Sequence, residues 1–369
     1  RVQACTMMCT PVLFFPMAEM PPMFDIECDV LEGLESYALE EFRERVGRFC
    51  SSITLQPGRI RAQYSGELQL LLRLRSVLAA YLVITYAVPR PRALLGHQHF
   101  THLLTTLETV RSLSRPELYR TLRLSAAGEN SSVLTRLKEA LAHHTGLVVA
   151  PDEGDLLIRL RRTPSRDGWE VLVRLSPRPL ATREWRVCNW PGSLNATLAS
   201  VMMRLTQPAA TDRVLNLACG SGTLLIERLF LAPARQAIGC DLDPKALQCA
   251  QRNLKAAGFA QSVRLEQWDA TSLPLETGSI DVLCADLPFG QLIGSHRMNE
   301  TLYPRLISEA ARVAAPGARM CLLTHEVRLM ERVLEQYADF WTLLTIVRVR
   351  TGGMTPRVYL AQRTTAPLS

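Results

Sequence analysis

Lysine is scarce in this chain of 369 residues. Only Lys138, Lys245 and Lys255 occur, so 39 of the 42 basic residues are arginine, and the basic residues exceed the 35 acidic ones by seven. Arginine suits contacts to phosphates and bases because its planar guanidinium donates two parallel hydrogen bonds. A GC-rich genome also favours arginine codons. The bias is therefore compatible with a nucleic-acid partner without establishing one.

Other sequence features are missing altogether. The chain contains no CxxC pair and no Cys/His cluster with zinc-ligand spacing, so we expect no metal and interpret the ten cysteines as free thiols of a cytoplasmic protein. No run reaches the roughly 18 apolar residues that a membrane helix needs, so we expect no membrane partner. GxGxxG is absent, as is GxxxxGK followed by Ser or Thr, which weighs against nicotinamide and triphosphate cofactors. The composition, 47% hydrophobic and 21% charged, excludes a disordered or rod-like chain.

Residues 1–180 are predicted to hold two small α+β modules after a tail or extension over residues 1–23. In the first module, residues 24–92, hydrophobic spacing predicts strands over Phe24–Val30, Ile60–Tyr64 and Leu68–Leu74 and a helix over Leu34–Phe49. The apolar run Val77–Tyr86 fits a helix or a strand. The second module, residues 93–180, is predicted to form helices over His99–Leu113 and Val133–Gly146 and strands over Leu147–Val149, Asp155–Arg161 and Trp169–Leu175.

Arginine clusters locally in the second module. Residues 111–186 contain 14 basic and 9 acidic residues. A charged strand face is usually just solvated, but an arginine-bearing module beside an enzyme is also a candidate RNA-docking surface. The candidate phosphate contacts are Arg159, Arg161, Arg162, Arg174 and Arg178. Alternate residues of a strand face opposite ways, so not all of them can serve.

Strands and helices alternate from residue 181 to the end of the chain, which predicts a doubly wound α/β sheet with a terminal β-hairpin. The expected strands are Arg213–Ala218, Gln236–Asp241, Val263–Gln267, Ile280–Ala285, Arg319–Thr324, Leu343–Arg350 and Arg357–Arg363. The expected helices are Leu194–Leu205, a helix from Thr223, Pro244–Ala257, Leu302–Ala314 and Val327–Tyr337.

Three strand ends in this region suit a nucleoside ligand. The turn Leu217–Thr223 contains Gly220 and Gly222 directly after a strand and before a helix, where glycine lets the backbone approach a ligand. Asp241 ends the next strand, where a carboxylate accepts ribose hydroxyls. Asp269 ends the third, where a carboxylate can accept the adenine amine. S-adenosylmethionine fits all three positions, although a lone Gly-x-Gly turn is a weak signal.

The fourth strand ends in Asp286-Leu287-Pro288-Phe289-Gly290. Such a segment is often a structural turn, but open α/β sheets bind substrates at this edge. The Asp286 carboxylate and the Leu287 carbonyl can accept hydrogen bonds from an exocyclic amine. Pro288 holds the loop rigid, and Phe289 can stack on a flipped-out base.

At this point the chain resembles a known family. The C-terminal part resembles class I methyltransferases of exocyclic amines, and residues 24–363 resemble THUMP-domain RNA methyltransferases, which include tRNA guanine-N2 methyltransferases. The resemblance rests on four segments: Leu175-Ser176-Pro177-Arg178-Pro179-Leu180; Pro191-Gly192-Ser193-Leu194-Asn195-Ala196-Thr197-Leu198-Ala199; Cys219-Gly220-Ser221-Gly222-Thr223; and Asp286-Leu287-Pro288-Phe289-Gly290.

The resemblance implies an N-terminal ferredoxin-like domain over residues 24–92, a THUMP domain over 93–180, and a Rossmann-like methyltransferase domain with a seven-stranded sheet over 181–369. It assigns catalysis to Asp286, Leu287, Pro288 and Phe289. The S-adenosylmethionine contacts that it implies, together with those expected from strand ends, are Ser193, Leu194, Thr197, Asn216, Ala218, Cys219, Gly220, Gly222, Thr223, Asp241, Leu242, Asp269 and Ala270. The Gly352–Arg357 loop resembles a family loop near the target base, and a plain hairpin connection explains it equally well.

One departure from the family concerns Asn216, where the family usually has an aspartate that meets the cofactor's ammonium group. An amide still accepts a hydrogen bond but lacks charge, so the departure predicts weaker cofactor binding. Asp-Leu-Pro-Phe also replaces the commoner Asn/Asp-Pro-Pro-Tyr/Phe motif, a variant that occurs within THUMP enzymes.

We therefore predict a cytoplasmic, monomeric enzyme that methylates the N2 amine of a guanosine in structured RNA, with the tRNA acceptor stem as the favoured substrate. The alternatives are a guanine-N2 methyltransferase of 23S rRNA, a DNA adenine-N6 methylase, and a non-catalytic RNA-binding protein with a decayed cofactor pocket. The DNA methylase would need a target-recognition domain, which the N-terminal half does not resemble.

Overall fold

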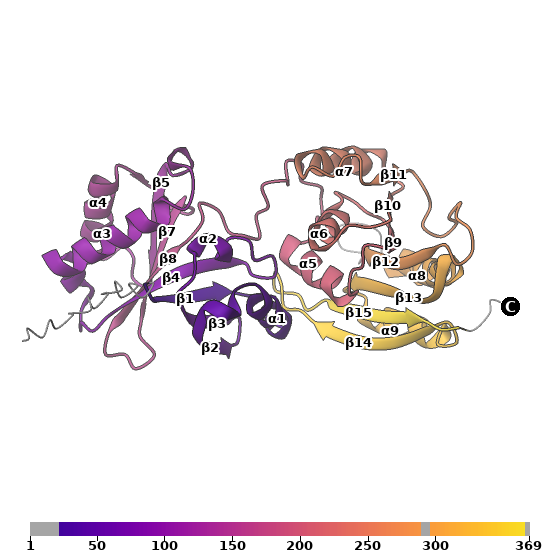
Figure 1. The fold of residues 1–369 in the computed structure, drawn as a ribbon, viewed down its shortest axis with the longest axis horizontal. Coiled ribbons are helices and arrows are strands. Elements are labelled where there is room, and N and C mark those ends of the chain that lie inside the picture. The colour runs from indigo at the N-terminus through magenta and orange to yellow at the C-terminus, as the bar shows by residue number, and fades with distance from the viewer. Residues whose placement is uncertain (1–21, 289–295, 366–369) are drawn as a thin grey trace, which may run out of the picture.

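The computed structural model describes residues 22–288 and 296–365, which form two α/β bodies side by side along the long axis of the molecule (Figure 1). We call residues 22–180 the N-terminal half, residues 181–195 the linker, and the rest the C-terminal domain. Each body is built around one sheet, and helices cover the sheets.

The N-terminal half contains a single eight-stranded sheet in the order β2-β3-β1-β4-β8-β7-β5-β6. Its strands are β1 (Phe24–Asp29), β2 (Cys50–Gln56), β3 (Arg59–Tyr64), β4 (Ala79–Tyr86), β5 (Thr121–Ala126), β6 (Val148–Val149), β7 (Leu156–Arg162) and β8 (Trp169–Arg174). The helices are α1 (Glu35–Val46), α2 (Leu68–Leu71), α3 (His97–Arg111) and α4 (Ser132–Thr145). Because β4 pairs antiparallel with β8, the two predicted modules share one sheet, and the boundary between them at residues 92 and 93 stays a prediction.

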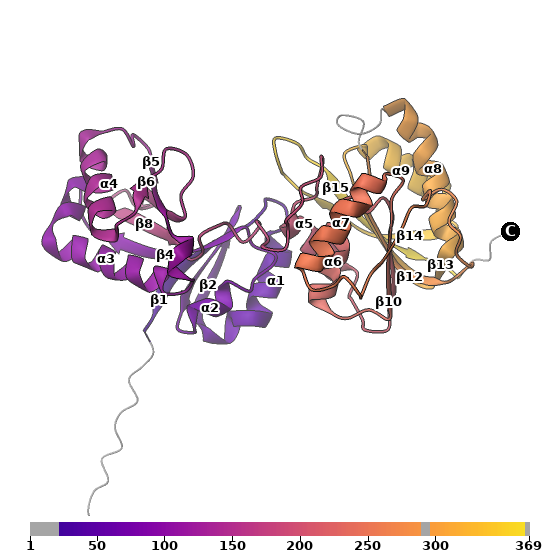
Figure 2. The same ribbon diagram turned by 90° about the horizontal axis from the view of Figure 1, so that it is seen from above.

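The C-terminal domain contains the predicted seven-stranded sheet, in the order β11-β10-β9-β12-β13-β15-β14, with β15 antiparallel to both of its neighbours. Its strands are β9 (Arg213–Asn216), β10 (Gln236–Cys240), β11 (Arg264–Glu266), β12 (Ile280–Asp286), β13 (Ala314–Thr324), β14 (Trp341–Arg348) and β15 (Arg357–Arg363). Figure 2 shows α6 (Thr223–Leu231) and α7 (Pro244–Ala256) on one face and α8 (His296–Val313) and α9 (Val327–Gln336) on the other. The doubly wound fold is thereby confirmed.

An apolar core joins the two bodies. Helix α5 (Ala196–Leu205) follows the linker, and its buried Leu198 and Met202 belong to the same cluster as Leu34 and Phe42 of the N-terminal half. Apolar burial of this kind holds surfaces together without fixing their angle, because the hydrophobic effect is non-directional. Within the described ranges, no helix is long and apolar enough to cross a bilayer.

Three expectations about the local structure were wrong or incomplete. Residues 68–74 form α2 and a turn rather than a strand. Leu68, Leu71 and Leu74 are the buried ones, a spacing of three that suits a helix and not the alternation of a strand. The edge strand β2 and the strand β5 were not predicted. The apolar run Val77–Tyr86, which fitted either a helix or a strand, contains the strand β4.

The expectation that all cysteines are free was also wrong, because Cys188 and Cys249 form a disulfide with a Cα–Cα distance of 5.5 Å. It joins the linker to α7 across 61 residues of sequence, a contact that cysteine spacing does not reveal. Six other cysteines of the described chain are free thiols: Cys28, Cys50, Cys219, Cys240, Cys284 and Cys321.

Candidate active site

A cavity of about 400 Å³ lies at the carboxyl ends of β9, β10 and β12, the edge at which open α/β sheets bind ligands. Its volume lies in the range of small-molecule sites. The structure brings most of the predicted site residues to its wall: Ser193, Leu194, Asn216, Ala218, Cys219, Gly220, Thr223 and Asp241, together with Asp286, Leu287 and Pro288.

The turn after β9 has an unusual backbone. Ala218, Gly220 and Gly222 have φ angles of 47°, 52° and 79°, so left-handed residues alternate with ordinary ones. This alternation turns successive N–H groups toward one side and is typical of backbone cradles for anions. Glycine meets the requirement without strain at two of the three positions, and only Ala218 carries a side chain there.

Asp241 ties this turn to the end of β10. Its carboxylate accepts hydrogen bonds from the backbone N–H of Gly220 at 2.9 Å and of Asp243 at 3.0 Å, one on each oxygen. Each carboxylate oxygen has a further lone pair, so Asp241 can still accept two hydroxyls of a ribose. The residue therefore both shapes the turn and presents acceptors to the cavity.

Asn216 lies at the floor of the cavity with one atom unsatisfied. Its amide nitrogen donates to the carbonyls of Leu217 at 3.2 Å and Cys284 at 3.0 Å, whereas its Oδ1 is buried and has no hydrogen-bond partner among the described residues. Buried acceptors are nearly always paired, so an unpaired one on a cavity wall indicates a donor on the ligand. An ammonium group is such a donor. The same two carbonyls also explain why an amide suits this position, since a carboxylate oxygen would be repelled by them.

The segment after β12 is held by helix α8. The Pro288 carbonyl accepts hydrogen bonds from Tyr303 Oη at 2.7 Å and Asn299 Nδ2 at 3.0 Å, and Leu287 N donates to Leu323 O at 2.9 Å. Burial raises the pKa of Asp286 from 3.8 to about 7. Phe289, the fourth predicted residue of this motif, lies outside the described residues.

Sequence reasoning missed the two α8 residues that fix this segment. Asn299 and Tyr303 are both buried and stand four positions apart, which places them on one face of the helix. Polar residues at that spacing on an otherwise apolar face were the available signal. Trp190, which lines the cavity, was also missed. So was Asn253, whose side chain forms hydrogen bonds with the backbone of Cys188 and with the Ser221 carbonyl and so connects the linker to the turn after β9.

Five predicted cofactor residues do not line the cavity as the described chain forms it. Thr197 is buried and donates to the Val77 carbonyl at 3.4 Å. Gly222 is the N-cap residue of α6 and lies close to Ala250 of α7. Asp269 accepts from the N–H and the hydroxyl of Thr271, both at 2.8 Å. The remaining two are Leu242, which is 65% exposed, and Ala270. Asp269 keeps free lone pairs, so its role toward adenine stays a prediction.

The five candidate RNA contacts differ in how far their guanidinium groups are already used. Arg174 is buried and donates to the carbonyls of Ser176, Gly154 and Pro177. Arg161 is held by two buried carboxylates, Glu27 and Glu170. Arg174 uses its guanidinium inside the protein, and Arg161, whose side chain is 33% exposed, uses its donors on the two carboxylates, so fewer of their donors are free for a phosphate and both assignments stay predictions.

The other three arginines remain accessible. Arg159 pairs with Asp29 at 2.6 Å and keeps 41% of its side chain exposed. Arg162 is exposed, stacks over Trp169 and donates to Pro89 O. Arg178 is 58% exposed, and its ion pairs with described residues are long, at 3.4 Å to Glu153 and 3.7 Å to Asp155. These three stay predictions.

Comparison with known proteins agrees with this geometry. Residues 183–356 match the model of the RMKL-like methyltransferase domain family. This match covers 47% of the chain and lies in the C-terminal domain, which is therefore similar to that methyltransferase family. The resemblance inferred from the sequence is thereby confirmed for this domain, and the class I methyltransferase fold is confirmed with it.

Several relatives show how far the similarity extends. A mouse protein named tRNA (guanine(6)-N(2))-methyltransferase THUMP3 is 33% identical over 186 residues, which cover 47% of this chain and only 37% of that protein. A Thermus thermophilus protein named tRNA (guanine(6)-N2)-methyltransferase is 29% identical over 350 residues, covering 92% of this chain and 99% of the relative. The crystal structure of TrmN from Thermus thermophilus superposes with a TM-score of 0.71 at 25% identity and covers 93% of this chain and 100% of its own.

Proposed function

We propose that the protein transfers a methyl group from S-adenosylmethionine to the N2 amine of a guanosine in tRNA. One observation carries the proposal: the cavity has acceptors for a nucleoside with an ammonium tail, Asp241 and Asn216, and the amine-directed segment Asp286–Pro288 on the same wall. The names of relatives from mouse and Thermus thermophilus support guanine N2 of tRNA as the target.

The residues of this chain would hold the cofactor and orient the amine. The turn at Gly220 and Asn216 Oδ1 would receive the methionine part of S-adenosylmethionine, and Asp241 the ribose. When bound, the cofactor supplies an electrophilic methyl group, so a nitrogen–carbon bond forms while the carbon–sulfur bond breaks and its electron pair stays on sulfur. Asp286 and the Leu287 carbonyl accept the two amine hydrogens, which turns the nitrogen lone pair toward the methyl group. With a pKa of about 7, Asp286 is suited to take up the proton that the amine then releases.

The pH dependence of the reaction follows from Asp286. Because burial raises its pKa to about 7, Asp286 is protonated below that pH, where it is a weaker hydrogen-bond acceptor and cannot take up the amine proton. We expect kcat/KM for the cofactor to rise with pH through about 7 and then level off, since this parameter reports the free enzyme. Asp286→Asn keeps an acceptor but cannot titrate, so its residual activity should lack this acidic limb. If kcat/KM of the Asp286→Asn variant still rises with pH through about 7, Asp286 is not the group that controls this pH dependence.

The accessible arginines provide a test of RNA docking. Arg178→Gln should weaken tRNA binding and reduce the slope of log Kd against log salt by about 0.7–0.9, the value for one phosphate contact. Arg174→Gln should instead lower thermal stability, because three backbone carbonyls lose their buried donor. Fluorescence anisotropy over a salt series and thermal melts separate the two effects. The same salt slope in Arg178→Gln and wild type would place the RNA elsewhere.

The alternative of a decayed cofactor pocket makes a different prediction for binding. Titration calorimetry should show S-adenosylmethionine binding with one site per chain, because the cavity acceptors are all in place. Failure to bind would favour the non-catalytic RNA-binding protein, whereas methylation of 23S rRNA in preference to tRNA would favour the ribosomal alternative. The monomeric state, the cytoplasmic location and the identity of the THUMP domain stay predictions.

A further inference from the structure

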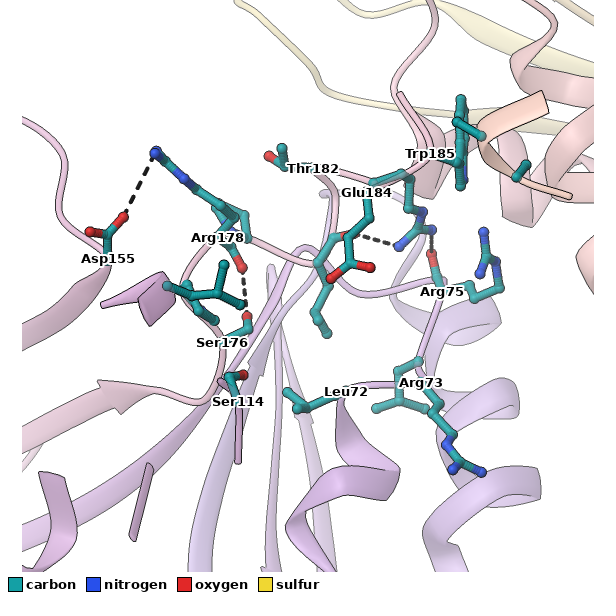
Figure 3. A pocket seen from close by; sticks show the side chains of 18 of the residues that line it. Leu72, Arg73, Arg75, Ser114, Asp155, Ser176, Arg178, Thr182, Glu184 and Trp185 are labelled. Carbon is teal, nitrogen blue, oxygen red and sulfur yellow. Dashed lines mark hydrogen bonds and ion pairs between the residues drawn. The ribbon is translucent and has the colours of Figure 1, made fainter. Parts of the chain in front are cut away.

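A cleft of about 870 Å³ lies between the N-terminal half and the methyltransferase domain, along the linker. Figure 3 shows Arg75 and Trp185 at its end near the methyltransferase domain and Arg178 and Asp155 at the other end. At the Arg75 end, two arginines from different parts of the chain meet at one carboxylate, that of Glu227, which is completely buried in α6.

The contacts to Glu227 are directional. Arg75, from the N-terminal half, donates from Nε to Oε2 and from Nη2 to Oε1, both at 2.8 Å. Arg183, from the linker, donates from Nε to Oε1 at 2.9 Å. A two-pronged guanidinium–carboxylate pair fixes an angle as well as a distance, unlike the apolar packing of α5. We call these three residues the Glu227 cluster.

Each arginine is itself fixed. The backbone N–H groups of Arg75 and Ser76 donate to the buried carboxylate of Glu41 in α1, at 3.0 and 2.6 Å, and the Arg75 guanidinium lies 3.9 Å from the ring centroid of Phe230 in α6. Arg183 donates to the Arg75 carbonyl at 2.7 Å and to the Leu180 carbonyl. The cluster therefore has little freedom to rearrange while the two bodies stay in contact.

The cluster is also connected to the glycine-containing turn after β9, which lines the active-site cavity. Glu227 stands four residues after Thr223, the first residue of α6, and one helical turn spans about 5.4 Å. Gly222 of the turn is the N-cap of the same helix, and Arg186 of the linker donates to Thr223 Oγ1 at 3.0 Å. A rotation of the N-terminal half relative to α6 would therefore change its position relative to the active site.

We propose that the Glu227 cluster sets the orientation of the N-terminal half relative to the methyltransferase domain and so determines which nucleotide of a docked RNA reaches Asp286. Arg75, Arg183 and Glu227 are positioning residues in this account and do not touch the substrate. The inference rests on the proposed function. It adds that the choice of nucleotide depends on an ion cluster that does not line the active-site cavity.

The test uses Arg75→Ala in the full-length protein. This change leaves Glu227 paired with Arg183, so no buried charge loses its last partner, and it removes the only arginine of the cluster that belongs to the N-terminal half. We expect the Kd values for tRNA and S-adenosylmethionine to stay within threefold of wild type, kcat to fall 10- to 100-fold, and methyl groups to appear on nucleotides beside the wild-type target. Nuclease digestion and mass spectrometry of the methylated tRNA map these positions.

Two variants serve as controls. Arg75→Lys keeps the charge but loses the two-pronged geometry, so it should recover part of kcat and of the positional accuracy. Arg204→Ala breaks another ion pair between the two bodies, the 2.7 Å contact with Glu44, whose side chain is 59% exposed. Exposed pairs contribute little, so this variant should match wild type. If Arg75→Ala methylates the wild-type position alone, whether or not its melting temperature falls, the proposal is overturned.

A second readout separates this inference from the proposed function. Spin labels on α3 and α9 report the distance distribution between the two bodies without RNA. The distribution should broaden in Arg75→Ala and not in Arg204→Ala. If the distribution broadens while wild type methylates no RNA guanine, the orienting role stands and the proposed function fails. If wild type is active and the distribution in Arg75→Ala is unchanged, the orienting role fails.

Discussion

Replacement of Asp286 by alanine is expected to lower the rate of methyl transfer by at least about 10³-fold, because the amine loses its charged acceptor and the group suited to receive its proton. S-adenosylmethionine should still bind within threefold of the wild-type Kd, since Asn216, Asp241 and the glycine turn are untouched. Single-turnover methylation of tRNA gives the rate, and calorimetry gives the Kd.

Asp286→Asn is the matched control. Its amide oxygen still accepts one hydrogen bond, so this variant should keep measurable activity where alanine has none. It should also be more stable than wild type at pH 8. Burial raises the pKa of Asp286 from 3.8 to about 7, so the folded protein holds this proton more tightly than the unfolded chain does. The free energy of unfolding of wild type therefore falls by up to about 4 kcal/mol as the pH rises from 3.8 to about 7. Alanine and asparagine variants with equal, near-wild-type rates would contradict the role of Asp286.

Replacement of Asp241 by alanine is expected to weaken S-adenosylmethionine binding about 100- to 10,000-fold. The variant loses two charge-assisted hydrogen bonds to the ribose, each contributing about 1.5–3 kcal/mol, and the turn loses the acceptor that holds Gly220 N at 2.9 Å. Calorimetry with S-adenosylmethionine and S-adenosylhomocysteine should show similar losses, because the ribose is common to both.

Asp243→Ser is the control for this variant. Asp243 also lines the cavity, but its side chain caps α7 by accepting from Lys245 N at 2.8 Å, and serine keeps that cap while removing the charge. Cofactor affinity should therefore stay within about fivefold of wild type. An equal loss in Asp241→Ala and Asp243→Ser would show that general negative charge, and not ribose recognition, governs binding.

The architecture of the methyltransferase domain could be predicted because its signals are local. Strand and helix patterns alternate along the chain. Gly220, Asp241 and Asp286 each lie at or just after the end of a predicted strand, which is where open α/β sheets bind ligands. The error at residues 68–74 has a local cause, since a four-residue helix is too short to show its period. Five of the seven residues of strand β2 are exposed and only Cys50 and Ile53 are half-buried, so the strand lacks the apolar alternation by which strands are found.

The interactions between distant segments could not be predicted. The Cys188–Cys249 disulfide, the contacts of Tyr303 with the Pro288 carbonyl, and the Glu227 cluster each join residues that one sequence gives no reason to pair. The arginines illustrate the same limit: Arg159 and Arg161 stand on one face of β7, and that face meets Asp29 and Glu27 of β1. Local clustering identified where arginines gather but not which of them are already neutralised.

The most direct test of the central claim is nucleoside mass spectrometry of unmodified tRNA after incubation with the purified protein and S-adenosylmethionine carrying a deuterated methyl group. The account predicts N2-methylguanosine with the full deuterium label, formed by wild type and absent with Asp286→Ala. A label on any other atom of the tRNA, or an equal yield of N2-methylguanosine from Asp286→Ala, would contradict it.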